Sequence, residues 1–563
     1  MKKIIFLLMC LLCLMVSVEA FAASKSHTGD KAELYNNGIA KGKIIFIPHD
    51  NRPVSDEMTA DTIRKLGYQV VVPPEDLLGN RENMGDSDKL WEWLEENSTV
   101  YRKPTKAEIK ANKSKAPVRD VDPEIRAMVI SADSMIYGSL VGSRKHKYSE
   151  SKLKPRVERF AKYKKAYPKA KLYVFSSIMR TPASGEHSGT EEPDYYKQYG
   201  LDIFRYSVLA DKADVKQLTK SEEKEKAFLQ ELIPEEYVKD WFGRREKNFK
   251  INQELLKLAK DNVFECLALG RDDNAAWSQT HMESRHLKEF TQKLGATKVH
   301  NLAGIDEVGM LMLTRAVNDI KSKYPVVSAQ YNWGNGTTTI PAYSDEPIDT
   351  TVREHVKLLG GHYSESADKV DLLLLVNTSP NGESPGANWY SNSTVLTSGV
   401  RYFADMVQGA VKDGYRVSIA DISFVNGSDN ALMAELSRRH LLYDVQSYAG
   451  WNTPTNSVGF ALAQGVLAKG MGAADKNQLL TIRYLDDWGY QANVRQTVAR
   501  QLSWFEGAGL YSRLGADKDR VEWRATGLLQ LFAERNLPAN EYIKNLQVTN
   551  PWSRLFEARI RIN

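Results

Sequence analysis

Short apolar runs alternate with helical sequence along most of the chain. In the first half, five runs rich in β-branched and aromatic residues are separated by segments with apolar positions at helical spacing. These runs are residues 43–47, 69–72, 127–131, 172–175 and 263–269. Strands that alternate with helices are typical of βαβ units. The pattern therefore predicts buried strands in a mostly parallel sheet.

The same alternation of apolar runs and helical sequence continues in the second half of the chain. Strands are predicted at 325–330, 370–376, 416–420 and 443–446, with helices at 398–412, 428–439 and 455–469. This organisation predicts an N-terminal α/β domain at 43–322 with a helical insertion near 211–260, a second α/β region at 323–471 and a mostly helical C-terminal region at 472–563. The fold class is α/β, with flanking helices on mostly parallel sheets. The strands form either two doubly wound lobes or a (β/α)8-like barrel, and in both cases functional residues lie at the carboxyl ends of strands.

The longest apolar run stands at the N-terminus. Lys2 and Lys3 precede an almost unbroken apolar stretch at 4–18, and small residues follow at 20, 22 and 23. This pattern predicts a signal peptide at 1–23, followed by a polar leader at 24–42. We therefore expect a secreted, periplasmic or cell-envelope protein. The alternative is that the segment is retained as a membrane anchor, which would be the one expected contact with a membrane. The apolar run is short for that role, because roughly 20 residues are needed to span a bilayer.

Composition narrows the classes of function. The chain has 563 residues, 42% hydrophobic and 26% charged, as in an ordinary globular protein. The net charge of +5 arises from 76 basic and 71 acidic residues, so no nucleic-acid partner is indicated. No Walker loop, GxGxxG motif or Gly-x-Ser-x-Gly elbow is present. We expect no nucleotide cofactor, and Cys266, the one cysteine outside the signal segment, is expected in the core.

Polar and mostly acidic residues follow the predicted strands at one position of the repeating unit. They are Asp50, Arg52, Asp133, Arg180, Asp272, Asp273, Asp306, Glu307 and Asp421. In a parallel sheet the carboxyl ends of strands share one rim, so these side chains would converge there. The alternative for each aspartate is that it caps the helix that follows.

The adjacent pair Asp272 and Asp273 suits acid catalysis. Two neighbouring carboxylates repel, which raises the pKa of one while the other stays ionised. Glycoside hydrolysis uses such a pair, so we expect Asp272 or Asp273 as general acid and Asp306 or Glu307 as the partner carboxylate. Clustered aspartates are alternatively a hard-cation site for Mg²⁺ or Ca²⁺, which leaves a metal-dependent hydrolase open.

The remaining polar residues are expected to bind substrate, a glycan or another small molecule. Asp50, Arg52, Asp133 and Arg180 would hold hydroxyl groups or a charged substituent. Other candidates are Glu283, which reaches the site or is a surface helix acid; Asp421, in a polar loop or a binding rim; Trp451, which stacks on sugar or packs in the core; and Asn452, which binds substrate or caps a helix. A non-catalytic envelope protein that binds a glycan or peptide is the third reading.

Several ordered motifs together resemble a known family. They are IPHDNRPV at 47–54, SADSMIYG at 131–138 with Ser143-Arg144, RDD at 271–273, GIDEV at 304–308, Asp421 with Asn426-Gly427, and YAGWNT at 448–453. The set is similar to the bacterial domain of unknown function 4127 (DUF4127), from about Lys43 to the helical C-terminus. The resemblance implies one conserved unit and brings no established activity.

Overall fold

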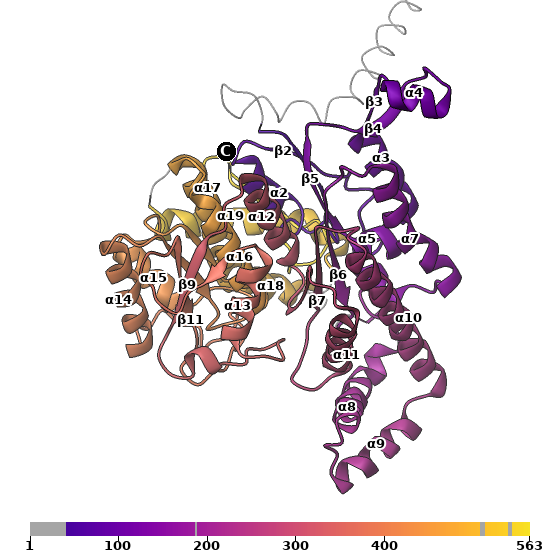
Figure 1. Cartoon of the computed structure of the whole chain (residues 1–563). Helices are drawn as coiled ribbons and strands as arrows, with labels where there is room; N and C mark the ends of the chain where they lie inside the picture. The colour runs from indigo at the N-terminus through magenta and orange to yellow at the C-terminus, as the bar shows by residue number, and fades with distance from the viewer. Residues whose placement is uncertain (1–40, 186–187, 507–512, 539–542, 563) are drawn as a thin grey trace, which may run out of the picture.

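The computed structural model describes residues 41–185, 188–506, 513–538 and 543–562 (Figure 1). The predicted signal peptide at 1–23 lies outside the described residues, as does the predicted leader up to residue 40. Within the described ranges, no helix combines the length and the apolar character needed to cross a membrane.

The first sheet has six parallel strands in the order β2-β1-β5-β6-β7-β8. They are β1 Lys43–Ile47, β2 Gln69–Val71, β5 Ile125–Ser131, β6 Leu172–Ile178, β7 Cys266–Arg271 and β8 Val299–Ala303. The strand order reverses between β1 and β5, as in a doubly wound fold, and loops at such a switch point form a crevice. Cys266 is buried in β7, where its side chain packs as a small apolar group.

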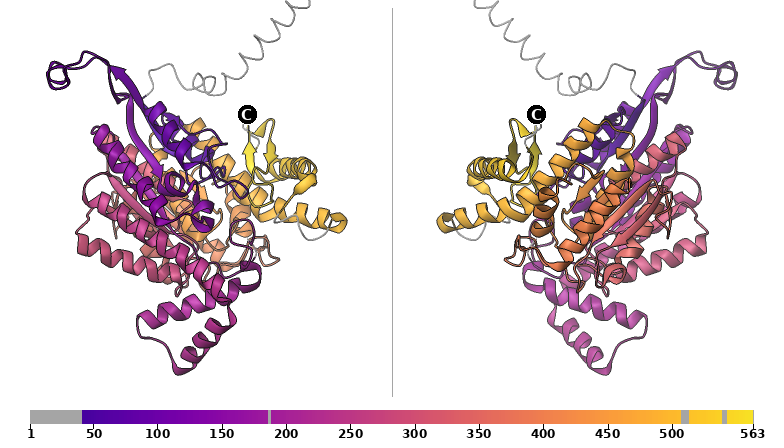
Figure 2. Two further views of the ribbon diagram at one scale, coloured as in Figure 1. Left: turned by 90° about the vertical axis from the view of Figure 1, so that its right-hand side faces the viewer. Right: turned by 90° about the vertical axis from the view of Figure 1, so that its left-hand side faces the viewer.

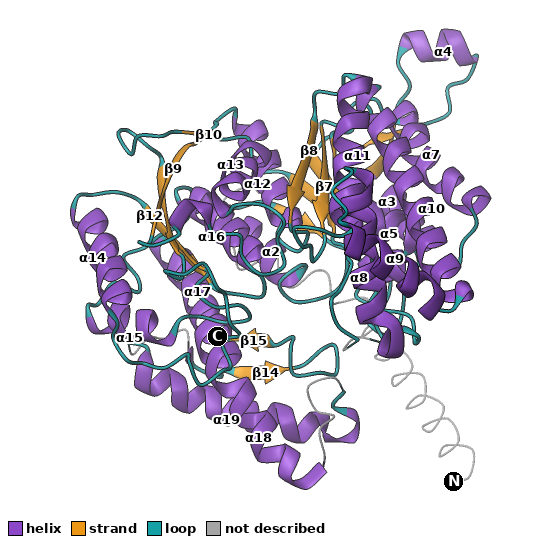
Figure 3. Ribbon diagram, turned by 90° about the horizontal axis from the view of Figure 1, so that it is seen from below, coloured by secondary structure: helices purple, strands orange, loops and turns teal. Residues whose placement is uncertain are grey.

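The second sheet repeats this topology with five parallel strands in the order β10-β9-β11-β12-β13. They are β9 Val326–Tyr331, β10 His362–Tyr363, β11 Leu372–Asn377, β12 Val417–Asp421 and β13 Ser447–Ala449. The two sheets are separate and open, as the view in Figure 3 shows. The predicted α/β class with mostly parallel sheets is confirmed, in its two-lobed form and not as a closed barrel.

Helices cover both faces of each sheet. In the first lobe they are α2 Glu57–Arg64, α3 Ser87–Ser98, α5 Ala132–Tyr137, α6 Leu140–Lys145, α7 Glu150–Ala166, α11 Gln279–Leu294 and α12 Val308–Lys321. In the second they are α13 Ile348–Leu358, α14 Ser398–Lys412, α15 Asn430–Arg438 and α16 Pro454–Ala468. The C-terminal part comprises α17 Ala473–Arg483, a π-helix Tyr484–Val494, α18 Arg495–Glu506, α19 Lys518–Asn536 and the hairpin of β14 Gln547–Thr549 and β15 Arg559–Arg561.

Two insertions project from the first lobe (Figure 2). One is helical and contains α8 Tyr196–Asp214, α9 Lys220–Leu232 and α10 Glu235–Lys260. The other is the antiparallel hairpin of β3 Thr99–Arg102 and β4 Val118–Val121, which carries α4 Lys106–Asn112 at its tip. Neither insertion adds a strand to a parallel sheet.

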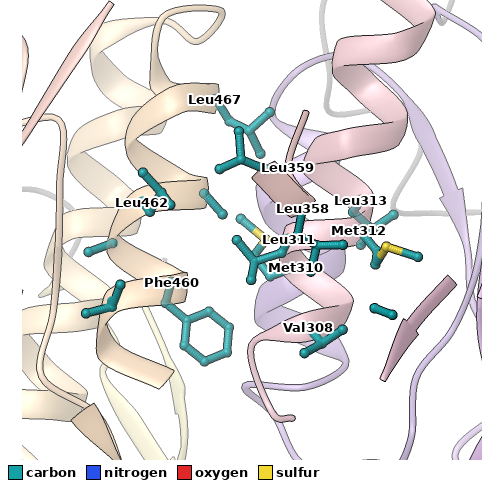
Figure 4. Packing of buried hydrophobic residues seen from close by; sticks show 14 of the residues in the cluster. Val308, Met310, Leu311, Met312, Leu313, Leu358, Leu359, Phe460, Leu462 and Leu467 are labelled. Atoms are coloured by element: carbon teal, nitrogen blue, oxygen red, sulfur yellow. The ribbon is translucent and has the colours of Figure 1, made fainter. Parts of the chain in front are cut away.

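One hydrophobic cluster spans both lobes. Helices α12 and α16 pack against each other between the two sheets (Figure 4). Met310 and Leu311 of α12 and Phe460 and Leu462 of α16 belong to the same buried cluster as residues of both sheets. Helix α16 is apolar or small on nearly every side, and such a helix is stable when it is fully enclosed. The lobes therefore share a core.

Candidate active site

The carboxyl ends of β1 and β8 meet at a buried ion pair. Arg52 donates to both oxygens of Asp306, with Nη2–Oδ1 at 2.6 Å and Nη1–Oδ2 at 3.2 Å. Its Nε donates to Asp50 at 2.9 Å, and His49 Nε2 lies 3.2 Å from Asp306 Oδ1. Burial alone would raise the pKa of Asp306, but the charge of Arg52 and the contact with His49 hold it well below its ordinary value. Asp306 is therefore an anion at neutral pH.

The acidic pair lies directly after β7. Asp272 accepts from Arg144 of α6, at 2.6 Å from Nη2 and 3.0 Å from Nε. Asp273 accepts from Arg180 Nη1 at 3.1 Å and keeps 29% of its side chain exposed. Burial and the neighbouring charge of Asp272 raise the pKa of Asp273 to about 6, against the opposing charges of Arg180 and Arg144. Of these acids, Asp273 is the one that solvent or a ligand can reach.

The backbone of Asp273 is also strained. Its φ is +25°, in a region that residues with a side chain seldom adopt. Strain of this kind persists where the surrounding structure holds it, and it is concentrated at functional sites. We call Asp50, Arg52, Arg144, Arg180, Asp272, Asp273 and Asp306 the acid–arginine cluster.

Asp133 lies behind the cluster. Its two oxygens accept from the backbone N–H and the hydroxyl of Ser177, at 2.8 and 2.9 Å. Burial raises the pKa of Asp133 to about 6, although the bonds from Ser177 and the charge of His49 lower it. The side chain has no exposed surface and links α5 to the end of β6. It is positioned to orient the strand ends rather than to touch a ligand.

Glu307 faces the second lobe. Asn456 of α16 donates to its Oε2 at 2.6 Å, and His355 Nε2 lies 3.4 Å from Oε1. Burial, with the negative charge of Asp306, raises the pKa of Glu307 to about 8. Burial lowers the pKa of His355 to about 4. Both groups are thus uncharged at neutral pH, and Glu307 is a buried inter-lobe contact.

The second lobe contributes Asn452 directly to the cluster. Its Nδ2 donates to Asp306 Oδ2 at 2.9 Å, while Thr453 caps α16. The neighbouring Trp451 is 2% exposed, and its ring lies against Phe460 and Phe556. Asn452 therefore reaches a site acid, whereas the faces of Trp451 are covered in the core.

Two predicted residues lie apart from the solvent-facing acids. Glu283 forms a two-bond ion pair with Arg245, at 2.8 and 2.9 Å, and Arg245 also donates to the carbonyl of Arg180 at 2.8 Å. Asp421 lies at the end of β12 in the second lobe, where it accepts from Asn377 at 2.9 Å and Tyr448 at 2.7 Å. Glu283 thus supports the segment that carries Arg180, and Asp421 belongs to a separate polar cluster.

A family model matches the chain over residues 44–102 and 115–561. This protein belongs to the DUF4127 family. The family is described as of unknown function. The unmatched stretch between the two ranges contains α4, at the tip of the projecting hairpin. No curated protein and no solved structure matches the chain.

Sequence reasoning missed several residues at the site of this DUF4127 protein. The ring of Trp552 lies 5.3 Å from the guanidinium carbons of both Arg52 and Arg554, and Arg554 donates to Glu191 at 2.5 Å. Glu192 pairs with Arg180 at 2.6 Å. These residues lie in loops and in the C-terminal segment. The prediction considered only residues that follow predicted strands, so it could not find them.

Tyr343 was missed as well. It belongs to the loop after β9, at the switch point of the second sheet, and its carbonyl accepts from the backbone N–H of Asn274 at 3.1 Å. Arg271 fixes this loop through Asp345 at 3.0 Å and Glu346 at 2.5 Å. The Tyr343 side chain is 47% exposed and its φ is +63°. The second lobe thus brings the backbone of a partly exposed tyrosine to the residue that follows the acidic pair.

Four aspartates of the DUF4127 site are each hydrogen-bonded to an arginine. Asp50, Asp272, Asp273 and Asp306 each accept from an arginine. Within the described ranges, no three His, Cys, Asp or Glu residues are grouped as a metal site would require. Because arginines already occupy oxygens of these carboxylates, the site suits a polar or anionic ligand better than a cation.

Proposed function

We propose that this DUF4127 protein is a secreted carbohydrate-active enzyme that hydrolyses glycosidic bonds, with Asp273 as general acid and Asp306 as the partner carboxylate. One observation carries the proposal. At one rim, a partly exposed carboxyl group has its pKa raised to about 6, while a second is held ionised by Arg52. Glycoside hydrolases use two carboxyl groups with different pKa values, one protonated and one ionised.

The two acids have distinct roles in the reaction. Asp273 transfers its proton to the leaving oxygen as the bond between that oxygen and the anomeric carbon breaks. The low pKa of Asp306 makes it a poor proton acceptor, so it acts as the anion that faces the positive charge on the anomeric carbon. Water then supplies the hydroxyl group to that carbon and returns a proton to Asp273. The net change is one glycosidic bond hydrolysed.

Exposed aromatic residues on the loop that contacts the segment after Asp273 support a sugar substrate. Tyr343 is hydrogen-bonded through its backbone to Asn274, the residue after Asp273. Trp333, on the same loop, is also exposed. Flat aromatic faces with a polar edge suit rings that are apolar on one side and hydroxylated at the rim. The predicted signal peptide is consistent with an extracellular glycan as the substrate.

The test is hydrolysis of a panel of aryl glycosides and cell-wall fragments by the mature protein. We expect Asp273→Asn to reduce kcat by about 10²- to 10⁴-fold, the usual contribution of a general acid. Asp306→Asn should also lose activity, whereas Asp413→Asn, at an exposed helix end, should not. Wild-type activity should fall as the pH rises through about 6, because Asp273 must be protonated. Unchanged turnover in both site variants would contradict the assignment.

The same preparations separate the two alternative functions. A metal-dependent hydrolase would lose activity on chelation and regain it with Mg²⁺ or Ca²⁺. A non-catalytic glycan-binding or peptide-binding protein would give tight binding in calorimetry, and the ligand would be recovered intact. Retained hydrolysis after chelation supports the proposed carboxylate chemistry.

A further inference from the structure

A cavity of about 240 Å³ lies at the seam between the lobes, apart from the acid–arginine cluster. Its walls come from α2, α12, α16, α17 and β15, and no residue of the acid–arginine cluster lines it. The apolar part of its wall includes Val54, Met58, Met310, Phe460, Leu479 and Ile482. Both lobes and the C-terminal strand therefore contribute to one partly open cavity.

The size of this cavity and the apolar part of its lining suit a small flexible hydrocarbon chain with a polar end. Its volume is just below the range of about 300–1,000 Å³ found for drug-sized ligand pockets, so the occupant is small. Methionine side chains are unbranched and polarizable, and they adapt to chains of variable shape. Met58 of α2 and Met310 of α12, both in the first lobe, supply this adaptable surface.

Charged residues also line the cavity, and not all of them are in ion pairs. Glu57 is paired with Arg559 at 2.8 Å, and Lys65 with Asp475 at 3.1 Å. Arg561 also lines the cavity and is exposed, and among the residues that the structure describes no acidic side chain pairs with it. Asp61, which also lines the cavity, is paired with Arg64 at 2.7 Å. One exposed guanidinium group of the lining is thus available for an anion.

We propose that this cavity binds a single-chain amphipathic carboxylate, a fatty acid of medium chain length. The hydrocarbon chain lies against the apolar wall, and the carboxylate is held by Arg561, because a guanidinium group matches a carboxylate with two parallel hydrogen bonds. A cationic head would meet Arg561 with like charge. A bound chain touches α2 and α12 of the first lobe, α16 of the second and α17 of the C-terminal part, so it stabilises their packing.

The test uses the full mature protein and decanoate below its micellar range. We expect calorimetry to show saturable binding of one decanoate per chain, with at least tenfold weaker binding of decanol and decylammonium. The thermal unfolding midpoint should rise with decanoate concentration, since a ligand that binds the folded state alone stabilises it. Absence of saturable decanoate binding would overturn the proposal.

Variants locate the ligand. Arg561→Gln should weaken decanoate binding about tenfold and leave decanol binding unchanged, whereas Arg126→Gln, at an exposed position outside the cavity, should change neither. Met58→Trp fills the cavity and should abolish binding, while glycoside hydrolysis is unaffected. Folding of each variant is checked by its unfolding midpoint without ligand. Decanoate binding that persists in Met58→Trp, or binding to anionic lipid vesicles but not to decanoate, would overturn the cavity assignment.

Discussion

Glu307 illustrates how burial controls a single carboxyl group. In the unfolded chain it titrates near its ordinary value of 4.5, whereas in the folded protein burial raises its pKa to about 8. The folded state thus retains a proton that the unfolded state releases between these pH values. The free energy of unfolding therefore falls as the pH rises from about 4.5 through about 8. Above that range the folded protein carries a buried charge.

We predict that Glu307→Gln removes this pH dependence. The amide keeps the size of the side chain and can accept from Asn456, but it never ionises. At pH 9 the variant should be more stable than the wild type by a few kcal/mol, since a tenfold change in an equilibrium constant is worth about 1.4 kcal/mol. Urea unfolding at pH 5, 7 and 9 measures the difference. Parallel pH curves for wild type and variant would refute the prediction, and Glu96→Gln on the exposed face of α3 is the control.

Tyr343 combines backbone strain with an exposed ring. At φ +63° a residue with a Cβ is disfavoured relative to glycine by about 1–2 kcal/mol. Tyr343→Gly should therefore be more stable than Tyr343→Ala by about 1 kcal/mol in urea unfolding. Both variants lose the ring, so both should raise KM for a glycan substrate while kcat changes less. Equal stability of the two variants would show that the backbone carries no strain there.

Residues directly after strands were the part of the site that the sequence could predict. Asp272 and Asp273 directly follow β7, a predicted strand, so the alternation of strands and helices places them at the rim of the sheet. Asp306 follows β8, which was not among the predicted strands, so its sequence position alone did not establish that it joins them. The same rule selects Asp421, which follows a strand of the other sheet. Trp552 could not be predicted, because its place beside Arg52 depends on the path of the C-terminal segment across the first lobe.

At the scale of elements, apolar strands were predictable and polar ones were not. The strand β1 was predicted with its observed bounds, and most other buried runs shift by a few residues. The run predicted at 443–446 is not a strand, because the chain joins the sheet only at Ser447–Ala449. There the Ser447 hydroxyl donates to Ala461 of α16, so a polar residue is satisfied inside the sheet without an apolar signal. The strand β8 was missed because it contains His300 and Asn301.

Helix α16 offers a prediction at this scale, because glycine lets it approach Glu307. A Cβ on Gly459 would lie 2.4 Å from Cγ of Glu307. Gly459→Ala should therefore destabilise the protein, although alanine favours a helix over glycine by about 1 kcal/mol. Gly527 of α19 has nothing within 4 Å of the same position, so Gly527→Ala should stabilise the protein by about 0.5–1 kcal/mol. Thermal unfolding compares the two, and stabilisation by both would contradict the close packing at α16.

At the scale of the whole molecule, the sequence left a barrel and two lobes open because both use the same alternation of strands and helices. The choice depends on which strands pair, and strand order is a long-range property. Two open sheets require an interface between them, which here consists of the shared core of α12 and α16 and of polar contacts at its edge. The site therefore depends on how the lobes are held together.

Arg271 is the polar contact that best tests this dependence. It is fully buried at the end of β7 and pairs with Asp345 and Glu346 of the second lobe. Arg271→Met should lower the free energy of unfolding by about 3–5 kcal/mol, because it leaves two acids without their cation. The triple variant Arg271→Met, Asp345→Asn, Glu346→Gln should recover most of this loss, because no unpaired charge remains.

Two measurements separate lost charge balance from lost packing at this contact. Urea unfolding followed by tryptophan fluorescence gives the stabilities. Hydrogen exchange of residues 332–347 reports whether the loop that carries Tyr343 is released. We expect faster exchange there in the single variant and near wild-type exchange in the triple variant. If the triple variant is as unstable as the single one, the shape of Arg271 and not its charge holds the lobes, and the ion pair is not what fixes the second lobe beside Asp273.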